Sequence, residues 1–110
     1  MTNGVNTPAE TILDEAHRLT SVDRQGSYGH PGDHHAATAT AVEAYLRKSG
    51  KLAAGAHLDA KDWQMFIILD KVMRGSGPEA LKRDTLTDIA GYARCVEKTY
   101  ARDGVPGFEA

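Results

Sequence analysis

Glycine-bearing breaks divide this chain into four segments that each carry a helical pattern. The breaks cover residues 21–32, 50–57 and 75–78, and the first and last also contain a proline. Between the breaks, apolar residues recur at the three- and four-residue spacing of an amphipathic helix. A strand is the alternative for residues 65–69, but the length of the surrounding pattern favours helix. The chain is therefore predicted to be all-α, folded as a four-helix antiparallel bundle with short connections.

Capping residues predict where these helices begin. Thr7 fits the N-cap of the first helix with Pro8 at its first position, and Asp59 fits the N-cap of the third. The third helix is apolar nearly all round, which predicts the most buried element. We expect helices near residues 8–20, 33–48, 60–74 and 84–102, within one helical domain of residues 8–103 and flexible tails at 1–7 and 104–110.

Composition excludes several classes of protein. The 13 basic and 15 acidic residues give a net charge of -2, which argues against stable binding of duplex nucleic acid. The single cysteine rules out a disulfide framework or a cysteine-rich zinc site. No apolar run reaches the ~20 residues of a membrane span, and the polar N-terminus is unlike a signal peptide. These features predict a cytoplasmic protein without a membrane partner.

The small size of the chain predicts an assembly. A chain of 110 residues has a marginal core, and exposed fringes of Trp63 and Tyr100 would remain uncovered. We therefore expect a homo-oligomer, a dimer or tetramer, with its deeper pocket built between subunits.

Aspartates fall in pairs at the starts of the last two helices. Asp84 and Asp88 are four residues apart, a spacing that puts both carboxylates on one helix face, roughly 6 Å apart. Asp59 and Asp62 form a second pair. One interpretation is that all four cap helices or complement their dipoles. The other is a magnesium site between helices, since Mg²⁺ takes carboxylate oxygens and completes its shell with waters and phosphates.

Cations follow directly on the apolar run of the third helix. Asp70 and Arg74 have the spacing of a surface salt bridge, yet Lys71 and Arg74 can also face one anion together. In the first break, Arg24 and Tyr28 are candidates to hold a phosphate and to stack a base, and the alternative is ordinary packing within the loop. Whether the neighbouring histidines belong to such a site or only to its rim stays open: His30, His34 and His35.

Three blocks of the sequence together resemble one family. DRQGSYGHP, ILDKVMR and RDTLTDIAGYA, in this order, resemble the MazG-like all-α nucleoside triphosphate pyrophosphohydrolases, in particular small phage members with R…YG, DKxxR and DTLxDxAxYA segments. The resemblance covers about residues 12–100. It implies a phage-encoded enzyme that uses Mg²⁺ or Mn²⁺ in the host cytoplasm and hydrolyses an NTP or dNTP to the monophosphate and pyrophosphate.

The resemblance and the spacing together define the candidate site. We take Asp84 and Asp88 as catalytic; Arg24, Tyr28, Lys71, Arg74 and Tyr92 as substrate-binding; and Asp59, Asp62, Asp70, Asp84 and Asp88 as metal ligands.

The chain departs from the family's better-known acidic motifs. Those members carry an ExxE motif followed by an ExxD motif. In this chain both motifs lack Glu, and the second acidic pair, Asp84 and Asp88, is four residues apart instead of three. Asp reaches about one methylene less far than Glu. The alternative is therefore a phage protein that binds or sequesters a nucleotide without turnover. A further alternative is a helical protein-interaction module whose acids serve as helix caps.

Overall fold

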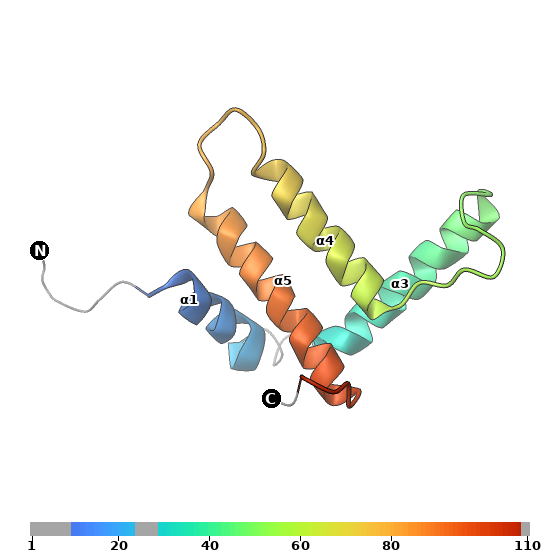
Figure 1. Cartoon of the computed structure of the whole chain (residues 1–110), viewed down its shortest axis with the longest axis horizontal. Coiled ribbons are helices and arrows are strands. Elements are labelled where there is room, and N and C mark those ends of the chain that lie inside the picture. Colours follow the sequence, from blue (N-terminus) through green and yellow to red (C-terminus); the bar gives the residue numbers. More distant parts are fainter. Residues whose placement is uncertain (1–9, 24–28, 109–110) are drawn as a thin grey trace, which may run out of the picture.

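A computed structural model describes residues 10–23 and 29–108, and within these ranges the chain forms four α-helices and no strand (Figure 1). The predicted all-α class is confirmed. A kinked turn, η1, follows the first helix, and its Ser21 has non-helical backbone angles of φ −101° and ψ −105°. The elements are α1 (Ile12–Arg18), η1 (Leu19–Asp23), α3 (Pro31–Lys48), α4 (Ala60–Arg74) and α5 (Arg83–Arg102).

Helix α5 is the element on which the others pack. It contacts α1, α3 and α4, and it lies between α1 and an antiparallel α4 (Figure 1). Helix α3 crosses the end of this layer. Its buried residues, Gly32, His35 and Ala39, all belong to its N-terminal half, while its C-terminal half extends away from α4 and α5 (Figure 1). The helices therefore form an open bundle, not a closed one.

The start of α4 agrees with the sequence. Asp59 accepts a hydrogen bond from the Asp62 backbone N–H at 2.9 Å, and Asp62 accepts one from the Asp59 N–H at 3.0 Å. This reciprocal pair is a capping box, which satisfies two helix-terminal donors. The Asp59 N–H, followed by the Lys61 ammonium, lowers the pKa of the Asp62 carboxyl.

Other helix starts differ from the prediction. Thr7 and Pro8 lie outside the described residues, and the N-cap of α1 is Thr11, whose hydroxyl accepts from the Asp14 N–H at 3.0 Å. Helix α3 begins at Pro31, two residues before Asp33, because proline suits the first helical position. Helix α5 begins at Arg83, so Asp84 lies within its first turn and is not its cap.

The described core contains few large apolar side chains. Its buried hydrophobic residues are three alanines, Ala16, Ala39 and Ala60, and its largest fully buried side chain is Gln64. Gln64 Nε2 donates to His35 Nδ1 at 2.9 Å and to Thr99 Oγ1 at 3.0 Å, which joins α4 to α3 and α5. Alanines let the helices approach closely, and the glutamine fixes their register.

Helix α4 is less buried than its composition predicts. Gln64 and Ala60 on one face are buried, but Phe66 and Leu69 on the opposite face are half exposed. The expectation that this helix is the most buried element is therefore wrong for one of its faces.

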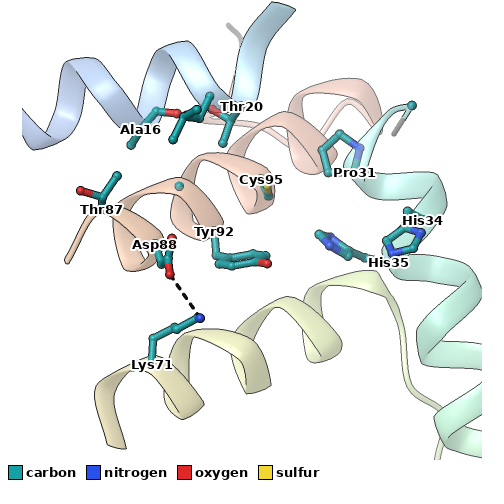
Figure 2. A pocket seen from close by; sticks show the side chains of 13 residues that line it. Ala16, Thr20, Pro31, His34, His35, Lys71, Thr87, Asp88, Tyr92 and Cys95 are labelled. Atoms are coloured by element: carbon teal, nitrogen blue, oxygen red, sulfur yellow. Dashed lines mark hydrogen bonds and ion pairs between the residues drawn. The ribbon is translucent and has the colours of Figure 1, made fainter. Parts of the chain in front are cut away.

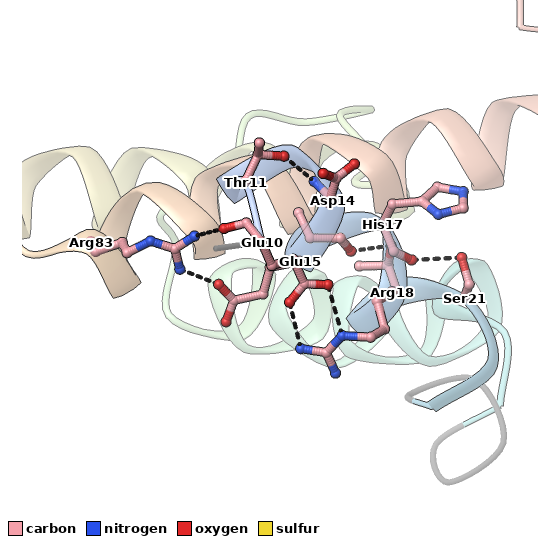
Figure 3. A network of polar contacts seen from close by, with 10 residues as sticks. Glu10, Thr11, Asp14, Glu15, His17, Arg18, Ser21 and Arg83 are labelled. Carbon is pink, nitrogen blue, oxygen red and sulfur yellow. Dashed lines mark hydrogen bonds and ion pairs between the residues drawn. The ribbon is translucent and has the colours of Figure 1, made fainter. Parts of the chain in front are cut away.

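An arginine clamp joins α1 to α5. Arg83 forms an ion pair with Glu15 and donates to the Glu10 carbonyl at 2.7 Å (Figure 3). Arg18 holds the Glu10 carboxylate with two hydrogen bonds, at 3.1 and 3.2 Å. At the other end of this contact, Lys98 Nζ donates to the Thr20 carbonyl at 2.6 Å. These contacts hold α1 and η1 along α5.

The connection between α3 and α4 is held by one carboxylate. Glu43 accepts from the Leu58 N–H at 2.7 Å, from Arg47 at 3.2 Å, and lies 3.2 Å from His57 Nδ1. The Leu58 N–H is the main reason that the pKa of Glu43 is lowered. After α5, residues 104–108 turn back, and the Phe108 ring meets the Tyr100 ring edge to face, with centroids 4.9 Å apart.

The capping box gives a first prediction. Asp59→Ala removes the side-chain acceptor and should lower the free energy of unfolding by about 1 kcal/mol. Asp59→Asn keeps an acceptor and should lose clearly less. Urea unfolding of both variants at equal protein concentration measures this. Equal losses would show that the negative charge of Asp59, and not its hydrogen bond, stabilises the helix.

Candidate functional site

A cavity of about 480 Å³ lies where α1, η1, α5, the start of α3 and Lys71 of α4 meet (Figure 2). This volume is within the roughly 300–1,000 Å³ of small-molecule sites. Ala16 and Thr20 line it from one side, and Asp88 and Tyr92 from α5. Sequence-distant residues are thus brought to one hollow.

An ion pair closes one end of this cavity. Lys71 Nζ of α4 lies 3.2 Å from Asp88 Oδ2 of α5, and Tyr92 follows one helical turn after Asp88 (Figure 2). The lysine side chain is 22% exposed and the aspartate 45%. Three residues predicted for one site therefore lie together, and both charges remain within reach of a ligand.

The rings of His34 and His35 line the other end, and the Tyr92 ring lies between them and the ion pair (Figure 2). The rings of His35 and Tyr92 are 6.1 Å apart between centroids, and His34 lies beyond His35 (Figure 2). Burial, and then the nearby His34, lowers the pKa of His35. Because Gln64 Nε2 donates to Nδ1 of this ring, the neutral imidazole carries its proton on Nε2. His35 thus offers a neutral donor beside the tyrosine ring.

Two hydroxyl groups bond helix carbonyls where the first helix ends in a kink at Ser21. The Thr20 hydroxyl donates to the Ala16 carbonyl at 2.7 Å, and the Ser21 hydroxyl donates to the His17 carbonyl at 2.6 Å. Such hydroxyls compete with backbone N–H groups for helix carbonyls. Thr20 lies on the cavity wall.

A second hollow adjoins the first at the ion pair. Its volume is about 490 Å³, and it shares Lys71 and Asp88 with the first cavity. Its other charged lining residues are Arg74, Lys82, Glu79 and Asp84. Three cations and three carboxylates therefore line this hollow, and Arg74 is also paired with an exposed carboxylate, Asp70, at 2.9 Å.

The predicted set of five metal-binding aspartates is not brought together. Asp62 precedes Lys71 by nine residues on α4, which is about 14 Å along the helix axis. Asp59 and Asp62 serve the capping box there. Across residues 10–23 and 29–108, no group of three or more His, Cys, Asp or Glu side chains is placed to hold a metal ion.

Two predicted ligand-binding residues, Arg24 and Tyr28, lie outside the described residues. Gly29, which follows them, lines the first cavity. His30 belongs instead to a corner with Arg102, whose guanidinium lies 3.3 Å from His30 Nδ1 and pairs with Asp33 at 2.6 Å. Burial, and then Arg102, lowers the pKa of His30. Of the three histidines left open by the sequence, His34 and His35 line the cavity.

Sequence reasoning missed Gln64 as the residue that positions His35. A signal was present, because Gln64 is a single polar residue inside the run Trp63–Leu69. A polar residue in such a run must find a buried partner or cost free energy. The identity of that partner depends on how α3 crosses α4, which spacing along the chain does not reveal.

The fold and the site define a class of protein, which is a helical domain with a cavity where its helices meet. More specifically, residues 11–100 match the family described as a domain of unknown function, DUF6378, and the chain belongs to this family. It is also similar to the Gene 55 protein of Mycobacterium phage D29, with 37% identity over 92 residues. That alignment covers 84% of this chain and 55% of the relative, so the chain spans about half of the relative's length. The expected relationship to phage proteins is thus confirmed.

No solved structure matches the chain. Among the helices of the described ranges, none combines the length and the apolar character that crossing a membrane requires.

Two histidines, one within α3 and one at its N-cap, predict a pH dependence. The lowered pKa values of His35 and His30 mean that below about pH 6.5 the unfolded chain binds more protons than the folded one. The free energy of unfolding should therefore fall between pH 7.5 and pH 5.5. His35→Gln should reduce this slope, and adding His30→Gln should reduce it further. Urea unfolding at both pH values measures the slope, and an unchanged slope in the double variant would contradict this explanation.

Proposed function

We propose that this chain binds a nucleotide in the first cavity. The observation that carries the proposal is the arrangement of the cavity itself, with aromatic rings at one end and a lysine at the other. A nucleotide has the same division, since its base stacks on rings and its phosphates pair with cations. The site would work in the cytoplasm of a phage-infected host.

The adjoining hollow supports a ligand with more than one phosphate. Lys71 stands between the two hollows, and Arg74 and Lys82 line the second. A phosphate bound by Lys71 would take over its contact with Asp88, and Arg74 would supply a planar fork for further phosphate oxygens. The MazG-like resemblance, with its DKxxR segment, agrees with a nucleoside triphosphate.

Lys71→Ala should weaken triphosphate binding by about 10- to 100-fold, since it removes a charge-assisted hydrogen bond. Tyr92→Ala should weaken it by about 10-fold through lost stacking, whereas Tyr92→Phe keeps the ring and should bind like wild type. Titration calorimetry with ribo- and deoxyribonucleoside triphosphates measures the dissociation constants.

Arg47→Ala is the matched control, because Arg47 is a paired cation in the C-terminal half of α3. It should bind like wild type. Equal binding by Lys71→Ala and Arg47→Ala would exclude this cavity as the nucleotide site.

Hydrolysis is a second function that we propose, on the observation that Asp84 and Asp88 lie one turn apart on α5 and both line the second hollow. Mg²⁺ is commonly held by one or two carboxylates together with substrate phosphates, so these two side chains fit such an ion. When bound, the ion would lower the pKa of a water and offset charge on the phosphates. Lys71 and Arg74 would orient the triphosphate beside it.

An assay of pyrophosphate release with Mg²⁺ or Mn²⁺ separates the two functions. If the chain is a pyrophosphohydrolase, Asp88→Asn should reduce release by about 100-fold or more while the protein still binds the triphosphate. Asp59→Asn, at the far end of α4, should leave release unchanged. Binding without release would support a sequestering protein. If the protein shows neither triphosphate binding nor pyrophosphate release, the remaining hypothesis is the protein-interaction module.

A further inference from the structure

Helix α4 presents an apolar stripe on the face opposite its packed side. The stripe consists of Met65, Phe66, Leu69, Val72 and Met73, whose exposed fractions lie between 45% and 64%. On a helix with 100° per residue, these five positions fall within about 60° of Leu69. Ala60 and Gln64, which are buried, lie on the other side of the helix. One helix therefore has two apolar faces, of which the described chain covers one.

The spacing of the stripe is symmetric. Counted from Leu69, its members lie at −4, −3, 0, +3 and +4. When two copies of such a helix pack antiparallel across a two-fold axis at Leu69, Met65 meets Met73 of the second copy and Phe66 meets Val72. A two-fold interface requires a self-complementary patch of this kind, in which residue i meets j and j meets i.

The helix dipoles favour the same arrangement. Antiparallel packing places the N-terminal end of one α4 beside the C-terminal end of the other, where the two dipoles attract. Lys71 takes no part in this contact, because it faces Asp88 on the packed side of the helix.

The exposed area agrees with what a specific dimer needs. Five half-exposed side chains of this size offer on the order of 500 Å² per chain, or roughly 1,000 Å² for two copies, which is about the lower limit of a specific interface. Of the nine large hydrophobic residues exposed among the described residues, five belong to this stripe.

We propose that the chain forms a two-fold symmetric dimer through this α4 stripe, with Leu69 at the axis against Leu69 of the second copy. The occupant of the stripe is a second copy of the chain because the patch complements itself in spacing, because antiparallel helix dipoles attract, and because two such stripes together offer the area that a specific interface needs. The proposal is independent of the ligand of the cavity, since the stripe residues line neither hollow.

Cross-linking tests the position of the axis. Helices that pack 8–10 Å apart bring facing Cα atoms to roughly 4–6 Å, within reach of a disulfide. In a Cys95→Ala background, Leu69→Cys should therefore form a disulfide-linked dimer under mild oxidation. Leu13→Cys, also exposed but on α1, is the matched control and should stay at background. Equal cross-linking of the two variants would overturn the proposal.

Charge substitution tests the same contact in solution. Light scattering of the wild type should give twice the chain mass of 11.9 kDa at micromolar concentration. Leu69→Asp and Leu69→Lys each place two like charges at the axis and should shift the protein to monomer. An equal mixture of the two variants should recover the dimer, because only then does Asp meet Lys.

The mixture also controls for single variants that fail to fold. If either variant alone is unfolded, circular dichroism should show helix content regained when the two are mixed. A wild-type monomer at 100 µM would overturn the proposal and leave the stripe to a different protein. A wild-type dimer that both charge variants preserve would place the interface elsewhere and would overturn it equally.

Discussion

The hydrogen bonds of Gln64 are the interaction on which the rest of the structure depends. From α4 this side chain reaches His35 on α3 and Thr99 on α5, so one buried amide holds three helices. Small side chains around it permit the close approach, but they provide little directional information. A buried polar group costs free energy unless it is paired, so the two Nε2 contacts favour this register of the helices, while Oε1 is buried without a hydrogen-bond partner among the described residues.

The same interaction connects the fold to the site. Pairing with Gln64 sets the tautomer of His35, and burial keeps the ring neutral by lowering its pKa. The helices that this contact aligns also bring Lys71 of α4 to Asp88 of α5, where the two hollows meet. A cavity with rings at one end and opposite charges at the other is the consequence. This polarity is what supports a nucleotide as the ligand.

Helix α4 contributes to the structure in three places. Its packed face contacts α3 and α5, its basic C-terminal end lines the two hollows, and its outer stripe is apolar and exposed. An apolar outer face costs free energy in water. A second copy would remove that cost and would explain why the helix is apolar nearly all round. Fold, site and assembly would then share one element.

Local chemistry made some features predictable from the sequence. The four helices and the N-cap at Asp59 follow from spacing, glycine breaks and side-chain acceptors within a few residues. Only the tertiary structure decided which pairs meet. It placed Asp88 against Lys71 and buried His35, because helix crossing is set by contacts between residues distant in the chain.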